Sequence, residues 1–189
     1  RLGITTSMHV APKLSGGRHD LRIRVSGCHN GCAQPESGDI GIYGEGKRQH
    51  GKLIPHYQMY FGGDGTSACG SIALKGPSIP AARIEQAIAR VQKTYDEEHV
   101  EGERFFGWAQ RQGAERFQSL LADLTQVSRF ELARLARDHG DEADFRVVSL
   151  GGGECASATD VAISRAFFDA AHERAYREAF TFQRKVEEA

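Results

Sequence analysis

Two cysteines carry the chemistry that this sequence most directly suggests. Cys28 and Cys32 lie in the stretch Ser-Gly-Cys-His-Asn-Gly-Cys-Ala-Gln. Thiolates are the usual protein ligands of iron–sulfur clusters and soft metal ions. Gly27 and Gly31 allow a tight backbone turn that would direct both sulfurs at one inorganic core. Because two thiolates do not complete a four-cysteine ligand set, the spacing alone leaves three interpretations open: a cluster or metal site, two unpaired buried thiols, or a helix turn that carries both cysteines by chance.

The cysteine pair follows a segment with the alternation of a half-buried strand. Leu21, Ile23 and Val25 alternate with Arg22 and Arg24, and a period of two residues is typical of a strand with one apolar face. The arginines on the opposite face have two interpretations. Either they are solvated, or they bind the carboxylates of a cofactor or an anionic substrate, since guanidinium groups pair bidentately with such oxygens.

Short strands are predicted first along the chain, and helices afterwards. After a short helical segment at 33–37, strands are predicted at 39–43, 57–61 and 71–74, and helices at 78–99, 103–112, 115–124 and 130–138. The Gly- and Lys-rich stretch 44–55 is predicted as a surface loop and 62–65 as a turn, because the latter lacks the Lys-Ser/Thr of a phosphate-binding loop.

The clearest helix is the one predicted at 78–99. Its residues Ile84, Ile88, Val91 and Tyr95 recur at helical spacing and form one apolar stripe. Ser78 is expected to cap its N-terminus. We expect the stripe to cover the sheet.

Charge and composition narrow the class of protein. The 189 residues carry a formal net charge of −1, which argues against nucleic-acid binding through a basic surface. No apolar run is long enough to span a bilayer, so no membrane segment is expected. Four cysteines, at 28, 32, 69 and 155, do not form the pattern of a secreted disulfide framework, so we expect a reducing compartment, the cytoplasm. Cys69 is interpreted as a lone thiol, and Cys155 either as a residue near a cofactor or as a small buried residue.

Several segments resemble one protein family. Residues 21–35, followed by 38–44, resemble the second cysteine motif of the sirohaem-dependent nitrite/sulfite reductases, which carry Cys-x5-Cys and, further on, Cys-x3-Cys. The resemblance continues in order at 56–64, 102–105, 139–141 and 153–156. His29 stands where this family commonly has a proline. The resemblance therefore covers most of the chain.

This resemblance implies two cofactors, a 4Fe–4S cluster and a sirohaem, that share one cysteine thiolate. Cys28 and Cys32 match the family's second cysteine pair and are implied cluster ligands, with Cys32 as the bridging sulfur. His29, Asn30 and Gly31 are implied to lie against the cofactor, where backbone N–H groups can tune the sulfurs. The first cysteine pair would lie upstream. We therefore expect this chain to be a C-terminal fragment that is inactive and binds neither cofactor alone, and no catalytic residue is assigned.

The implied activity is that of an assimilatory sulfite reductase haemoprotein, the six-electron reduction of sulfite to sulfide. Reduction of nitrite to ammonia is the alternative. No dinucleotide-binding fingerprint is present, so the expected electron donor is ferredoxin or a flavoprotein reductase subunit. Interpretations from other classes are a zinc or small iron–sulfur module that uses all four cysteines, and a cofactor-free scaffold that docks a partner.

The implied fold is α/β (α+β): a mixed, mainly antiparallel sheet with helices on one face, forming half of a pseudo-two-fold reductase core. Residues 1–125 are expected to form the sirohaem and 4Fe–4S domain, and residues 126–189 a C-terminal extension. Within the extension, a strand is predicted at 145–150 and a long helix from Ser157 to the end, opened by a capping-box-like pattern. That helix either packs on its own domain or docks a partner.

Overall fold

The computed structural model of the chain describes residues 21–66, 70–139, 141–146 and 174. The chain divides into two compact units, Arg1–Val147 and Val148–Ala189, and the fold described below belongs to the first. The predictions for Cys69, Cys155 and the helix from Ser157 lie outside the described residues, apart from the single helical residue 174. The expected domain boundary at residue 125 stays a prediction.

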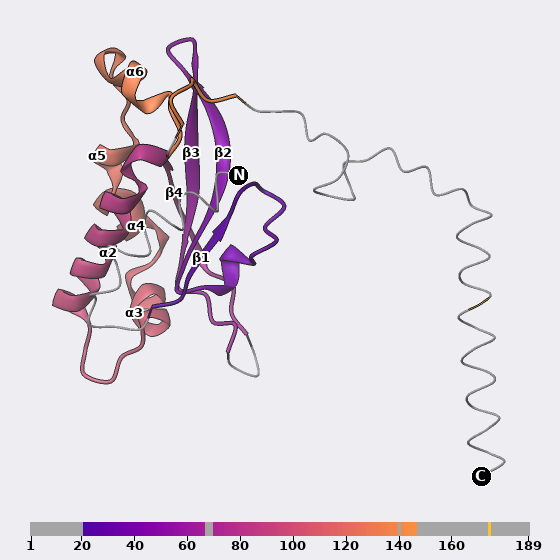
Figure 1. Cartoon of the computed structure of the whole chain (residues 1–189). Coiled ribbons are helices and arrows are strands. Elements are labelled where there is room, and N and C mark those ends of the chain that lie inside the picture. The colour runs from indigo at the N-terminus through magenta and orange to yellow at the C-terminus, as the bar shows by residue number, and fades with distance from the viewer. Residues whose placement is uncertain (1–20, 67–69, 140, 147–173, 175–189) are drawn as a thin grey trace. The chain divides into compact units, whose positions relative to one another are not determined.

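A four-stranded sheet in the order β1-β2-β3-β4 organises the described fold (Figure 1). The strands are β1 (Ile23–Ser26), β2 (Ile40–Gln49), β3 (Lys52–Phe61) and β4 (Leu74–Pro80). β1 runs parallel to β2, whereas β2 with β3 and β3 with β4 are antiparallel. The predicted mixed, mainly antiparallel sheet is confirmed.

The stretch 44–55, predicted as a surface loop, instead forms most of a β-hairpin. β2 and β3 stay paired up to Gln49 and Lys52. His50 and Gly51 make the turn, with φ values of 48° and 82°, and a type I′ hairpin needs positive φ at both positions. The composition misled the prediction because cross-strand pairing outweighs the low strand propensity of glycine and lysine.

The predicted strand at 71–74 and the predicted helix start at Ser78 are both wrong. β4 runs through Ser78, and a 3-10 helix, η2 (Ala81–Arg83), then leads into α2 (Ile84–Glu98). Pairing with β3 keeps the backbone around Ser78 extended. Its hydroxyl donates to a carboxylate oxygen of Glu45 (2.5 Å) instead of capping a helix.

The remaining helices are short. They are α3 (Phe105–Gln112), α4 (Ala114–Leu120), α5 (Ala122–Thr125), the 3-10 helix η3 (Arg129–Glu131) and α6 (Leu132–Leu135). The helix predicted at 103–112 corresponds to α3, the one predicted at 115–124 is divided into α4 and α5, and the helical turns predicted at 130–138 correspond to η3 and α6. Gly113, with φ of 76°, separates α3 from α4. Of the strand predicted at 145–150, only Phe145 and Arg146 lie within the described residues, and neither is in a strand. The Phe145 amide instead donates to the Ala136 carbonyl (2.7 Å), next to an isolated bridge between Arg137 and Asp144.

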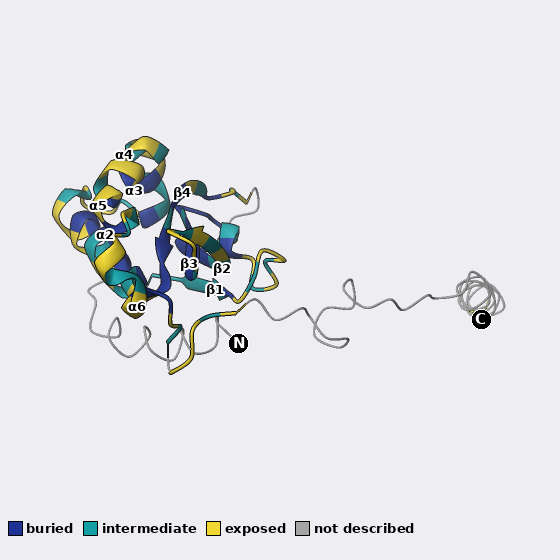
Figure 2. Cartoon of the chain, turned by 90° about the horizontal axis from the view of Figure 1, so that it is seen from above, coloured by how far each residue is buried: buried dark blue, intermediate teal, exposed yellow. Residues whose placement is uncertain are grey.

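The core lies between one face of the sheet and the helices (Figure 2). The predicted stripe of α2 is buried along its whole length. It packs with alternate residues of the two central strands, namely Ile40, Ile42, Tyr57, Met59 and Phe61, and with the aromatic residues Phe105, Trp108 and Phe117. The rings of Phe61 and Phe117 stack with centroids 4.2 Å apart. Helices therefore cover one face of the sheet, as predicted.

The opposite face carries η1 (Pro35–Ser37), a 3-10 helix that packs on β1 and β2. A Cβ atom at Gly41 would lie 1.9 Å from the Pro35 carbonyl oxygen, and one at Gly63 would lie 2.3 Å from that of Glu36. Gly41 alternates with core residues of β2, so it faces away from the helices. The bare glycine backbone allows η1 to sit directly on the sheet.

Replacement of Gly41 by alanine should destabilise the fold by at least about 2 kcal/mol, because the added methyl group meets backbone atoms that cannot rotate away. Urea unfolding of the 189-residue chain measures the change. Gly107→Ala in α3 is the matched control, since a Cβ there has its nearest neighbour at 3.7 Å. The control should be neutral or stabilising by up to about 1 kcal/mol. Equal midpoints for G41A and the unsubstituted chain would contradict the close contact.

Candidate functional site

Residues 27–34, called the cysteine loop below, leave the end of β1 and run into η1. The Gly31 amide donates to the Cys28 carbonyl (3.3 Å), and the Gln34 amide donates to the Gly31 carbonyl (2.7 Å). Gly31 and Gln34 have left-handed φ values of 62° and 51°, which turns of this kind require. The loop is thus a series of tight turns.

The two thiols differ in their exposure. Cys28 is half-buried, Cys32 is exposed, and both are free. No helix includes them, so the interpretation as a helix turn is wrong, and the exposure of Cys32 excludes a pair of buried thiols. Two thiols on one short, turned segment remain as the arrangement to explain.

Two side chains of β1 form hydrogen bonds with the C-terminal part of the cysteine loop. The Ala33 amide donates to Ser26 Oγ (3.0 Å), and Arg24 Nη1 donates to the Ala33 carbonyl (3.2 Å). Ser26 is only 5% exposed. The residue directly after Cys32 is therefore held on both its amide and its carbonyl side.

Arg22 joins the start of β1 to the start of β2. Its Nε and Nη2 atoms donate to the two carboxylate oxygens of Asp39 (2.9 and 3.0 Å), and its backbone amide donates to Oδ2 (2.9 Å). Hydrogen bonding to Asp39 is the largest cause that raises the pKa of Arg22. Because this guanidinium pairs with a protein carboxylate, Arg22 is not simply solvated, and binding of a cofactor carboxylate or an anionic substrate by the arginines of β1 stays a prediction.

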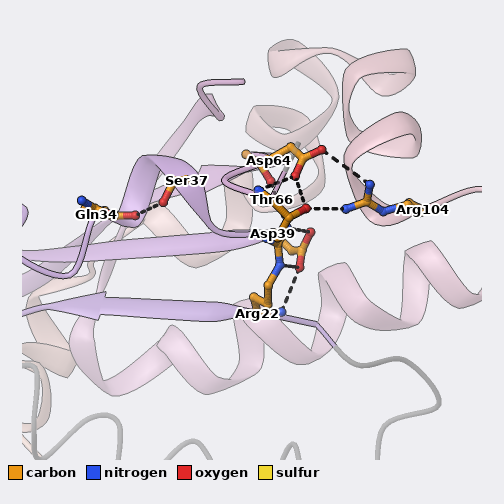
Figure 3. A network of polar contacts seen from close by, with 8 residues as sticks. Arg22, Gln34, Ser37, Asp39, Asp64, Thr66 and Arg104 are labelled. Atoms are coloured by element: carbon orange, nitrogen blue, oxygen red, sulfur yellow. Dashed lines mark hydrogen bonds and ion pairs between the residues drawn. The ribbon is translucent and has the colours of Figure 1, made fainter. Parts of the chain in front are cut away.

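A second polar network holds the turn at 62–65 (Figure 3). The Asp64 Oδ1 atom accepts hydrogen bonds from the amide (2.9 Å) and the hydroxyl (2.7 Å) of Thr66, and Arg104 Nη1 lies 3.5 Å from Asp64 Oδ2. Backbone bonds between Asp64 and Ser71, both 2.9 Å, close the loop above it. A buried carboxylate with these partners suits a structural turn, as predicted, and not a phosphate-binding loop.

The sheet face that carries η1 also holds a tyrosine pair that sequence reasoning missed. Tyr43 of β2 and Tyr60 of β3 have ring centroids 5.9 Å apart. Tyr43 is the register partner of Ser26 in β1, so the pair lies beside the strand that holds the cysteine loop. Burial, and then a hydrogen bond with Tyr43, raise the pKa of Tyr60 to about 12. The alternation of Ile40 and Ile42 with the residues between them was the available signal that Tyr43 faces away from the core.

The residues of the cysteine loop fit one part of a metal ligand set. Within the described part of the chain, no group of three or more His, Cys, Asp or Glu side chains is arranged to hold a metal ion. Two free thiols at the end of a strand suit two positions of a four-thiolate set. His29 and Asn30 are exposed between them. The donor set is therefore compatible with an iron–sulfur cluster completed by thiolates from elsewhere.

Comparison with known proteins assigns the family. The model of the nitrite and sulphite reductase 4Fe-4S domain matches residues 18–127, a range that contains the cysteine loop and all four strands. The chain belongs to this family. The family inferred from the motifs is confirmed, and the motifs at 139–141 and 153–156 lie outside the matched range.

Curated relatives of this family member include reductases for both oxyanions. The chain is 25% identical over 95 residues to an assimilatory ferredoxin-dependent nitrite reductase of Haloferax mediterranei, covering 50% of this chain and 16% of the relative. It is 27% identical over 115 residues to the sulfite reductase (ferredoxin) of Mycobacterium tuberculosis, covering 56% and 21%. It is 31% identical over 96 residues to a sulfite reductase (NADPH) hemoprotein beta-component of Methylobacterium, covering 50% and 14%.

A solved structure has the same fold over the matched part. The structure of the Mycobacterium tuberculosis NirA protein superimposes with a TM-score of 0.52 at 25% identity, covering 59% of this chain and 22% of that one. This family member thus spans about a fifth or less of the curated relatives described above. In the regions that the structure describes, no helix is both long and apolar enough to cross a membrane.

The tyrosine pair gives a pH-dependent prediction. Because the folded-state pKa of Tyr60 is about 12 against a usual value of 10.0, its contribution to stability is complete below pH 10 and is lost as the pH rises toward 12. Tyr43→Phe should bring the pKa of Tyr60 down, because one of the two largest causes of the shift is removed. NMR of ring-labelled tyrosine follows the titration, and Tyr60→Phe assigns the signal. Titration of Tyr60 near pH 10 in the unsubstituted chain would contradict the prediction.

Proposed function

We propose that this chain supplies two cysteine thiolates to a 4Fe–4S cluster in a sirohaem-dependent reductase, and that the complete protein reduces sulfite to sulfide. The observation that supports this most is the presence of two free thiols on one short turned loop, inside the segment that matches the reductase family. The missing thiolates would come from a cysteine pair upstream of this segment, as the family pattern implies.

The five residues from Cys28 to Cys32 each have a role in this proposal. Cys28 and Cys32 would hold the cluster as thiolates, and Cys32 would also be the sulfur shared with the sirohaem. His29, Asn30 and Gly31 would lie against the cofactor, where their backbone N–H groups could donate to the sulfurs and tune them. When bound, the linked cluster and sirohaem supply electrons one at a time to the oxyanion.

Sulfite is the proposed substrate, and nitrite is the second candidate. The similarity to relatives named sulfite reductase supports the first, and the similarity to the Haloferax nitrite reductase supports the second. Relatives named for ferredoxin and for NADPH support ferredoxin or a flavoprotein reductase subunit as the electron donor. Thiols that must stay reduced suit a cytoplasmic location. The ratio of kcat/KM for the two oxyanions in the complete protein, with reduced ferredoxin as donor, decides the substrate.

The 189-residue chain alone should purify colourless and without stoichiometric iron. The described residues offer only two suitable thiols, and two thiolates do not hold a four-iron cluster. Visible absorption and metal analysis after anaerobic purification measure this. A haem Soret band from this chain alone would contradict the prediction. Stoichiometric bound zinc or iron would favour a self-contained metal module that also uses Cys69 and Cys155.

In the complete protein, Cys32→Ser should remove the bridging sulfur. Both sirohaem ligation and reductase activity should then be lost. A hydroxyl is a poor ligand for a soft iron–sulfur site, so the loss should exceed about a hundredfold in turnover. Absorption of the sirohaem and sulfite-dependent oxidation of the electron donor are the two measurements. Cys69→Ser is the matched control and should keep both. Full activity of C32S would refute the bridging role.

A further inference from the structure

The residue after Cys32 is held to the sheet through both its amide and its carbonyl group. Ala33 donates its amide N–H to Ser26 Oγ (3.0 Å) and receives a hydrogen bond from Arg24 Nη1 on its carbonyl (3.2 Å). Both side chains come from β1, the strand that leads into the loop. The chain therefore turns back within seven positions and binds the strand it has just left.

Planarity of the peptide bond passes this restraint to Cys32. The plane that contains the Ala33 N–H also contains the Cys32 carbonyl and the Cys32 Cα. Holding that N–H on Ser26 thus restrains the position of the Cys32 Cα. It leaves the direction of the sulfur to the Cys32 side-chain torsion. The Arg24 bond fixes the next peptide plane, between Ala33 and Gln34.

The side chains of Ser26 and Arg24 are themselves held in place. Ser26 is 5% exposed, and its backbone lies in β1 opposite Tyr43 of β2. The stem of Arg24 runs so close to Gly38 that a Cβ there would lie 3.0 Å from Arg24 Cγ. Buried or tightly packed side chains lose little further freedom when they bind. The two groups are therefore preorganised to hold Ala33.

The loop before Ala33 is held by turns of its own backbone. The Gly31 amide donates to the Cys28 carbonyl (3.3 Å), and the Gln34 amide donates to the Gly31 carbonyl (2.7 Å). Cys32 itself is exposed, as are His29 and Asn30. The two hydrogen bonds of Ala33 connect this turned segment to side chains of the sheet.

We propose that Ser26 and Arg24 are positioning residues that hold the Cys32 backbone so that its sulfur is presented to the iron–sulfur cluster at a fixed separation from Cys28. This inference rests on the proposed function. A ligand loop that is already in its bound geometry needs little rearrangement to bind, and groups that orient ligands in this way raise metal affinity. Ser26 contributes through its acceptor oxygen and Arg24 through its donor, and neither touches the cluster.

The first test uses the 189-residue chain and needs no cofactor. Ser26→Ala removes the acceptor of the Ala33 amide, so hydrogen exchange of that amide should become faster by about five- to tenfold. Ser26→Thr keeps an acceptor oxygen and should restore slow exchange. Ser78→Ala removes a hydroxyl that binds Glu45 on another strand and should leave Ala33 unchanged. Unchanged hydrogen exchange of the Ala33 amide in S26A would show that Ser26 does not restrain this residue, and would overturn the proposal.

The second test uses the complete reductase with its cluster. S26A and Arg24→Met should each speed the loss of the cluster to an iron chelator by about tenfold or more. They should also shift the electron paramagnetic resonance g-values of the reduced cluster. S26T should restore both properties, and Arg48→Met, at an exposed position of β2, should change neither. Chelator rates and g-values in S26A and R24M equal to those of the unsubstituted protein would overturn the positioning role.

The two tests separate the two proposals. A complete protein without any iron–sulfur cluster would overturn the proposed function, and with it the positioning role of Ser26 and Arg24, even if Ala33 exchange behaves as expected. A protein whose cluster is normal and unaffected by S26A and R24M would overturn the positioning role alone.

Discussion

The geometry of the cysteine loop depends on one constraint, the close packing of η1 against the glycine backbone at Gly41 and Gly63. At Gly41 and Gly63 the carbonyl oxygens of η1 approach so closely that no side chain would fit. The loop therefore starts from a hydrogen-bonded strand and ends on a helix that is pressed against the same sheet. With both ends fixed, a few turns and two side-chain contacts suffice to define the segment between them. Loops positioned by a rigid scaffold in this way commonly carry function.

One face of the sheet forms the apolar core, and the opposite face carries polar groups. Apolar alternate residues of β2 and β3 meet α2, α3 and α4 in a core with stacked and edge-on aromatic rings. The opposite face carries η1 and also hydroxyl, phenol and carboxylate groups at Ser26, Tyr43, Tyr60 and Glu45. Such a face can present polar groups without weakening the core, because the helices bury the apolar face separately.

Two ion pairs of this fold hold neighbouring backbone segments together. Arg22 joins the starts of β1 and β2 through Asp39, and Asp64 holds its turn through Thr66 and Arg104. The Arg22–Asp39 and Asp64–Arg104 pairs connect segments that are far apart in the sequence, whereas the hydrogen bond between Asp64 and Thr66 is local. Their value lies in the register they impose, since partly exposed ion pairs add little net stability. The register of β1 on β2 in turn decides where the cysteine loop begins.

Sequence reasoning succeeded where a pattern depends on local periodicity. The stripe of α2, the strand before the cysteines, the short helix after them and the break at Gly113 all follow from side-chain spacing or from one residue's conformational preference. It failed at the β2–β3 hairpin and at β4, where residues of low strand propensity are extended because a partner strand supplies their hydrogen bonds. The partners of Arg22 and Ser26 were also out of reach, because the sequence does not show which acceptors the fold brings near them.

The amino-acid sequence by itself determined the chemistry that is available: two thiols in a glycine-rich turn, an adjoining strand of alternating character and the motifs of one reductase family. Only the tertiary structure decided that Ser26 and Arg24 meet Ala33, that η1 rests on Gly41, and that Tyr43 and Tyr60 face the same side as the loop. The reason is physical. Side-chain spacing is a property of the local chain, whereas a hydrogen bond across a turn or between strands exists only once packing and register have set the distance between its two atoms.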